Sequence, residues 1–131
     1  MLASAHLRIA RATEDLPRLV DFSSGALGFD VIGSFEDHDG FDGVMLGHAG
    51  AGYHLEFTHR HGEEVGSAPT EENLLVFYLP DPAKWQAAVD HMRANGVEPV
   101  APANRYWALR GVTFEDPDGY RIGLENSAWS R

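Results

Sequence analysis

The sequence has no cysteine among its 131 residues. This absence excludes disulfide bonds, a cysteine nucleophile and zinc sites with thiolate ligands. Basic residues are also scarce, with 10 Lys and Arg against 20 Asp and Glu and a net charge of −10. A nucleic-acid-binding protein needs clustered positive charge to displace counterions, so we do not expect a nucleic-acid partner.

Long hydrophobic runs are missing as well. No stretch approaches the roughly 18 apolar residues that a membrane-spanning helix needs. The N-terminal segment, MLASAHLRIARATED, lacks the apolar core of a signal peptide. We therefore expect a cytoplasmic protein with no membrane partner. The composition, with 44% hydrophobic and 23% charged residues, is typical of a folded domain, and the length suits one domain.

The first half of the chain contains the pattern of a strand, a helix and three further strands. Polar and apolar residues alternate over residues 5–11, and a helical pattern follows. We expect Thr13 to cap this helix, with Glu14 and Asp15 in its first turn and Gly28 as a left-handed residue at its end. Three strands are predicted next, at residues 30–35, 41–46 and 53–58.

The second half repeats this order. A β-type run covers residues 73–79, and Pro80-Asp81-Pro82 opens a helix that ends at Asn95-Gly96. Strands are predicted at residues 97–100, 111–115 and 120–126. The last two of these strands are joined by a turn at Asp116-Pro117-Asp118-Gly119.

The two halves align at a nearly constant spacing. Leu27-Gly28-Phe29 matches Asn95-Gly96-Val97, and residues 52–57 match residues 119–124 at almost the same separation along the chain. The same order of elements at one spacing indicates an internal repeat. We therefore predict a single domain over residues 1–131, made of module one (about 5–61), a polar linker (about 62–72) and module two (about 73–128).

Two segments resemble the vicinal oxygen chelate superfamily, which contains glyoxalase I, bleomycin-resistance proteins and extradiol dioxygenases. They are residues 21–29, DFSSGALGF, and residues 114–122, FEDPDGYRI. Ser23 departs from the family pattern, which commonly has tyrosine there. The resemblance implies an α+β fold of two tandem βαβββ modules, which form a curved mixed sheet around a pocket with helices outside. It also implies a homodimer.

The resemblance further implies four positions for the ligands of a divalent metal, on the first and last strands of each module. In this sequence they are Arg8 or His6, Glu56, Leu74 or Leu75, and Gly123.

Arginine, leucine and glycine side chains cannot ligate a metal, so this four-ligand site is incomplete. A divalent metal held by His6, Glu56 and Glu125 is the alternative, and no cofactor follows with certainty from the sequence.

Other charged and aromatic residues are candidates for the lining of the pocket. Glu56 would act as a catalytic base with His54 as its partner, or would form an ion pair with Arg8. Arg8 and Arg121 would clamp an anionic group of a substrate, or would pair with acidic side chains.

Tyr106 and Trp107 precede a predicted strand. They would stack on a planar substrate or pack a loop onto the domain.

The resulting hypothesis is a glyoxalase-like protein with a small-molecule pocket, acting as a lyase, isomerase or dioxygenase-type enzyme. The alternative is a metal-free dimeric binding protein that sequesters a drug or metabolite, as bleomycin-resistance proteins do. A fold of this kind does not by itself decide between the two.

Overall fold

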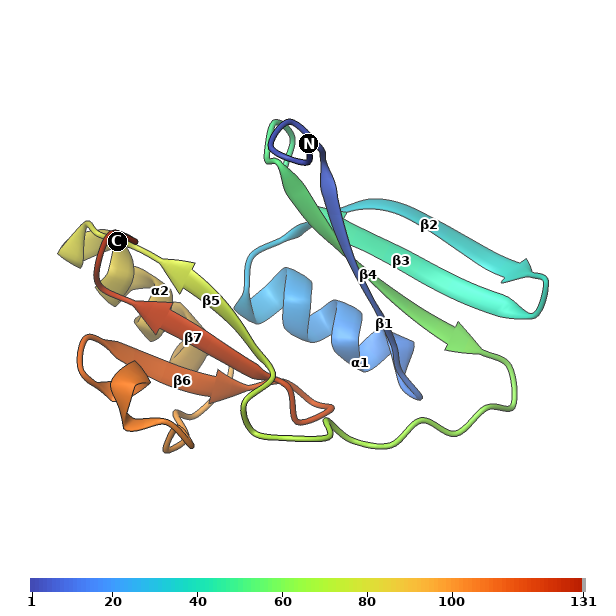
Figure 1. Ribbon diagram of the computed structural model, residues 1–131. Helices are drawn as coiled ribbons and strands as arrows, with labels where there is room; N and C mark the ends of the chain where they lie inside the picture. Colours follow the sequence, from blue (N-terminus) through green and yellow to red (C-terminus); the bar gives the residue numbers. More distant parts are fainter. Residues whose placement is uncertain (131) are drawn as a thin grey trace. The chain divides into compact units, whose positions relative to one another are not determined.

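In the computed structural model, which describes residues 1–130, the chain divides between Val65 and Gly66 into two units (Figure 1). The first unit contains β1 (Leu7–Ala12), α1 (Leu16–Asp21), β2 (Asp30–His38), β3 (Phe41–Gly47) and β4 (Tyr53–Arg60). Its sheet has the order β1-β4-β3-β2, in which β1 runs parallel to β4 and the other pairs are antiparallel.

The core of the first unit lies between this sheet and α1. Leu46, Leu55 and Phe57 are buried, and so is Leu19 on the helix, which contacts β3 and β4. Side chains alternate between the faces of a strand, so the neighbours of Leu55 and Phe57 on β4 lie on the opposite face. This second face holds the charged residues considered below.

The start of α1 differs from the prediction. Asp15 is the N-cap residue, and its carboxylate accepts a hydrogen bond from the Arg18 N–H at 3.1 Å. Thr13 lies before the cap and accepts from the Asp15 N–H through its hydroxyl. The reason is the position of Pro17, which fits the first turn of a helix that begins at Leu16.

The end of the helix agrees with the prediction. A π-helical turn over Phe22–Ala26 extends α1, and Gly28 follows with a φ of 72°. A residue with a side chain would be strained in this left-handed conformation.

The second unit contains β5 (Leu74–Tyr78), α2 (Pro82–Ala94), a short 3-10 helix (Arg105–Ala108), β6 (Gly111–Glu115) and β7 (Arg121–Glu125). Its sheet has the order β5-β7-β6, with β5 parallel and β6 antiparallel to β7. Val89 and Met92 of α2 are buried on the helix side with Phe114, Ile122 and Leu124.

Two segments of the second unit test the sequence analysis. The predicted turn after β6 is confirmed, because the Asp116 carboxylate accepts hydrogen bonds from the N–H groups of Asp118 and Tyr120. The predicted strand at residues 97–100 is wrong, since only Val100 pairs, in an isolated bridge to Thr113. Pro99 has no N–H to donate to a ladder, which limits the pairing to this single bridge.

The internal repeat is confirmed by the pairing of the strands. In each unit the first strand lies parallel to the last, with a helix between them in sequence. The chain therefore has an α+β fold of two βαβββ-like modules with mixed sheets. None of the helices within residues 1–130 is long and apolar enough to cross a membrane.

Candidate functional site

Four polar side chains form a connected network on the face of the first sheet that points away from α1. The register of β1 and β4 places Arg8 opposite His54 and Ala10 opposite Glu56. The Arg8 Nε–H donates to His54 Nε2 at 2.8 Å, and Arg8 also forms an ion pair with the Glu56 carboxylate at 3.2 Å. His6 Nε2 lies 2.5 Å from His54 Nδ1.

The arginine determines the tautomer of His54. Arg8 can only donate, so His54 Nε2 must accept and the ring hydrogen of neutral His54 lies on Nδ1. Nδ1–H then donates to His6 Nε2. Desolvation lowers the pKa of His54, and the charge of Arg8 lowers it further, while the Glu56 carboxylate opposes them. His54 is therefore a neutral link between Arg8 and His6 at neutral pH.

The network thus unites four residues that the sequence analysis selected, Arg8, His6, His54 and Glu56. The ion pair between Arg8 and Glu56 corresponds to the second of the two roles proposed for that carboxylate. The Glu56 side chain is 12% exposed and that of Arg8 is 49% exposed, so solvent screens this ion pair in part.

The network does not reproduce a four-ligand metal site. Leu74 faces Arg121 across the β5–β7 pair, so Leu74 and Val76, rather than Leu75, share the face of Gly123. Leu74 and Gly123 offer no ligand atom, and the Glu56 carboxylate is paired with a permanent cation. These positions do not fit the metal that the resemblance implies.

A three-ligand alternative combined His6, Glu56 and Glu125. His6 and Glu56 belong to the first unit and Glu125 to the second. Residues 1–130 contain no cluster of three or more His, Cys, Asp or Glu side chains placed to hold a metal ion.

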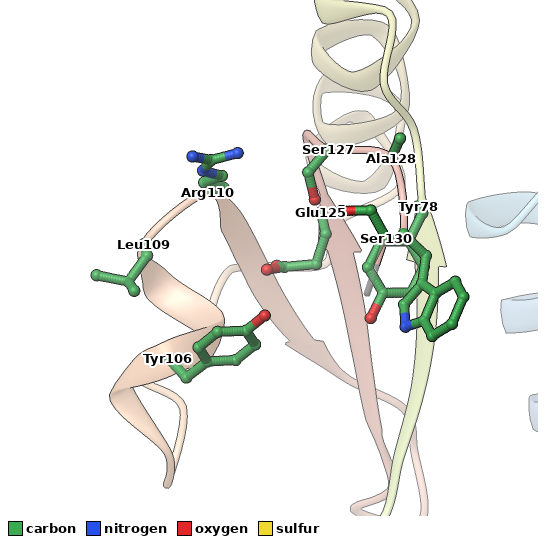
Figure 2. A pocket seen from close by; sticks show the side chains of 9 residues that line it. Tyr78, Tyr106, Leu109, Arg110, Glu125, Ser127, Ala128 and Ser130 are labelled. Carbon is green, nitrogen blue, oxygen red and sulfur yellow. The ribbon is translucent and has the colours of Figure 1, made fainter.

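The second unit contains a cavity of about 340 Å³ beside β7 (Figure 2). Its lining comes from β5, the 3-10 helix and the segment after it, the end of β7 and the residues that follow β7. These lining residues are Tyr78, Tyr106, Leu109, Arg110, Glu125, Ser127, Ala128, Trp129 and Ser130.

Glu125 supplies a buried acid to this cavity. The residue is 4% exposed, and its Oε2 atom has no hydrogen-bond partner within residues 1–130. Burial raises the pKa of this carboxyl group above its ordinary value. Among the groups that line the cavity, Arg110 is basic, and Figure 2 shows its guanidinium directed away from the Glu125 carboxylate.

Gly111 provides the space that this carboxylate occupies. It faces Glu125 across the β6–β7 pair, and a Cβ atom at residue 111 would overlap the Glu125 carboxylate. A glycine inside a strand often marks such a close approach. Gly111, Tyr78 and Trp129 were not among the residues that the sequence indicated. The alternation of β5 could have indicated Tyr78, which shares a face with Leu74 and Val76.

Arg121, a predicted substrate-binding residue, lies in the second unit. Arg121 is buried, with ion pairs to Glu71 at 3.2 Å and Glu115 at 3.5 Å and a hydrogen bond to the Ala101 carbonyl. Its guanidinium therefore already holds three segments of the second unit together. Substrate binding by Arg121 stays a prediction.

Tyr106 and Trp107 pack edge to face in the 3-10 helix, with ring centroids 5.1 Å apart. Tyr106 is 60% exposed and lines the cavity, whereas Trp107 is half-buried and is not among the lining residues. The sequence suggests the same role for Tyr106 and Trp107, but of these two residues only Tyr106 lines the cavity.

The first unit has a further cavity of about 500 Å³ on the helix side of its sheet. Its lining includes Glu14, Asp21, Glu36 and Asp42, together with Phe35. It lies on the opposite face from the Arg8 network.

Comparison with known proteins gives matches along both modules. The YycE-like N-terminal domain matches residues 7–58, and the YycE-like C-terminal domain matches residues 72–126. The YycE protein of Bacillus subtilis (strain 168) is 42% identical over 124 residues, which cover 95% of this chain and 89% of the relative.

Comparison with solved structures also identifies YycE as a similar protein. The crystal structure of YycE from Bacillus subtilis has a TM-score of 0.89 and 41% identity, over 97% of this chain and 93% of that one. The fosfomycin resistance protein FosX from Listeria monocytogenes, solved with Mn(II), has a TM-score of 0.73 and 18% identity, over 98% and 95%. TnmS3, an antibiotic binding protein from Streptomyces sp. CB03234, has a TM-score of 0.65 and 24% identity, over 92% and 93%. The last two likenesses concern the fold alone.

Proposed function

The chain belongs to the YycE-like family, within the vicinal oxygen chelate superfamily, and we propose that it binds a small organic molecule without the four-ligand metal site of that superfamily. The cavity beside β7 is the proposed binding site. Its volume lies within the usual range of small-molecule pockets, about 300 to 1,000 Å³. TnmS3, an antibiotic binding protein of the same fold, is a precedent for this activity.

One observation carries the proposal. Of the four positions that would ligate a metal, Leu74 and Gly123 have no ligand atom, and Glu56 is engaged by Arg8 at 3.2 Å. A metal at this place would have to displace the arginine from the carboxylate and would then find too few other ligands. Binding through side chains of the protein alone needs no such rearrangement.

Metal analysis combined with ligand screening tests the proposal. The protein is purified without chelators, its metal content is measured, and a library of antibiotics and aromatic metabolites is screened by thermal shift with and without EDTA. We expect no stoichiometric metal and at least one compound that raises the melting temperature equally in both conditions.

Variants sharpen this test. Glu56→Gln and His6→Ala are compared with Glu98→Gln, which removes an exposed carboxylate of the second unit. Stoichiometric metal in the wild type and in Glu98→Gln, but lost in both other variants, would contradict the proposal. Ligand binding that disappears with EDTA would contradict it too.

A lyase, isomerase or dioxygenase-type enzyme is the second candidate, and the Arg8–His54–His6 chain favours it. A neutral imidazole with a defined tautomer can transfer a proton to or from a substrate. The enzyme hypothesis requires a divalent metal at the pocket. The metal analysis above therefore separates the two candidates.

The proposed binding unit is a homodimer. β1 is an edge strand of the first sheet, and its Leu7 and Ile9 are exposed at 55% and 36%. Exposed apolar side chains on an edge strand favour association with another chain. Light scattering coupled to size-exclusion chromatography tests this: we expect a mass of twice the 14.4 kDa of one chain, and the mass of a single chain would refute it.

A further inference from the structure

We infer that the cavity beside β7 selects an organic cation, an amine or guanidine with an aromatic body, which pairs with Glu125 and lies against the aromatic side chains around it. This inference deepens the proposed function and rests on it, because it names the class of ligand that the same cavity takes. Four features of the second unit support it.

The first feature is the buried acid that lines the cavity. Glu125 is 4% exposed, and its Oε2 atom has no hydrogen-bond partner within residues 1–130. A buried carboxylate without a partner is costly, and a cation that enters the cavity would supply the missing partner. The ion pair that results would be shielded from water and stronger than one at the surface.

The second feature is the space reserved for this acid. Gly111 lies opposite Glu125 in the β6–β7 pair, and any side chain at residue 111 would overlap the carboxylate. The carboxylate can therefore stay folded into the cavity instead of extending to solvent. Both the acid and the residue that admits it belong to paired strands, which hold the geometry rigidly.

The third feature is a group of exposed apolar side chains in the same cavity as the acid. Tyr78, Tyr106, Leu109 and Trp129 line the same cavity, and all four are exposed, at 37%, 60%, 75% and 66%. A cluster of exposed apolar side chains is typical of a binding surface. Aromatic faces attract ammonium and guanidinium groups as well as planar rings.

The fourth feature is the charge of the surroundings. Figure 2 shows the Glu125 carboxylate and the Tyr106 ring facing the same space, while the Arg110 guanidinium is directed away from it. The second unit, residues 66–131, has nine Asp and Glu against six Lys and Arg, and this net charge of −3 attracts cations rather than anions. An anionic ligand would meet a buried acid and an acidic unit, so the charge favours a cation.

Matched pairs of probes test the inference on the full chain. We use 2-phenylethylamine and its neutral analogue 2-phenylethanol, with tryptamine and benzamidine as further cations, and follow binding by titration calorimetry and amide NMR. We expect the amine to bind about ten-fold more tightly than the alcohol, which corresponds to one charge-assisted contact. We also expect the largest shifts at the ends of β6 and β7.

Variants locate the effect. Glu125→Gln should reduce the affinity for the amine to that for the alcohol, whereas Glu98→Gln, which removes the same charge at an exposed position, should retain the preference. Tyr106→Ala changes an exposed side chain and leaves the core intact, and it should weaken binding of every aromatic probe several-fold.

Several outcomes would overturn the inference. They are equal affinities for amine and alcohol, a preference that persists in Glu125→Gln, or no binding of any of the three cations at millimolar concentration. If neutral compounds from the library still bind in those cases, small-molecule binding stands and only the choice of a cation fails. If no compound of any charge binds, the proposed function fails instead.

Discussion

Gly111 and Gly123 lie in adjacent strands of the second sheet, and the structure predicts opposite results for the same Gly→Ala change. At Gly111 the added methyl group would overlap the Glu125 carboxylate and lie 2.6 Å from the Leu124 carbonyl oxygen. At Gly123 it would meet only Leu74 and Val76 methyl groups, at 3.6 to 4.0 Å. The first contact requires a shift of the structure and the second does not.

The size of the effect follows from these distances. Ordinary contact begins at 3.4 Å, so the backbone around Leu124 must move by 0.8 Å (3.4 minus 2.6 Å) besides the displacement of the carboxylate. Overpacking of this kind costs about 1 to 3 kcal/mol, and the lower entropy of the unfolded alanine variant returns about 0.4 to 1 kcal/mol. We expect Gly111→Ala to lose about 2 kcal/mol and Gly123→Ala to gain about 0.5 kcal/mol.

Urea denaturation followed by tryptophan fluorescence measures this difference. All three tryptophans, Trp85, Trp107 and Trp129, lie in the second unit, so the signal reports on the affected sheet. Equal free energies of unfolding for Gly111→Ala and Gly123→Ala would refute the reasoning, and so would a more stable Gly111→Ala.

Three further predictions concern charges and a helix cap. Burial raises the pKa of the Glu125 carboxyl group above its ordinary value of 4.5, so the folded chain binds the carboxyl proton more tightly than the unfolded chain does. The contribution of Glu125 to the free energy of unfolding therefore falls as the pH rises above 4.5. Melting curves should therefore show Glu125→Gln gaining stability relative to wild type as pH rises; a constant difference would contradict this. Arg8→Met should raise the pKa of His54 toward its ordinary value in an NMR titration, because the arginine charge helps to lower that pKa. An unchanged titration would show that the Arg8–His54 contact is absent in solution. Asp15→Ala should cost about 1 kcal/mol in urea denaturation, since the carboxylate accepts from the Arg18 N–H. Because Asp15 is the cap, Thr13→Ala should lower the free energy of unfolding by no more than Asp15→Ala does.

Much of the fold follows from local patterns. Four features follow from the sequence alone because each depends on neighbours in sequence: the alternation of β1 and β4, the helix opened by Pro82, the turn at Asp116 and the left-handed Gly28. The repeat extended these predictions over both modules. The predictions fail where two nearby residues could fill the same role. Both Thr13 and Asp15 could cap α1, and Asp15 does.

The network of the first unit was predictable in part. Alternation alone places Arg8 and His6 on one face of β1, and His54 and Glu56 on one face of β4. Which of these side chains pair depends on the register between β1 and β4, two strands that are far apart in sequence. From the sequence alone, Glu56 is therefore either a base or the partner of Arg8.

What the sequence by itself determined is the α+β repeat and the face on which each strand residue lies, because residue identity and alternation suffice for these. Only the tertiary structure decided that Glu125 is a buried acid whose Oε2 atom has no partner within residues 1–130, that Gly111 makes room for it, and that Tyr78, Tyr106 and Trp129 line the same cavity. These residues come from separate segments, and their burial and distances arise only when the strands pair. Desolvation and close contact are properties of that packing, and a linear pattern of residue types does not contain them.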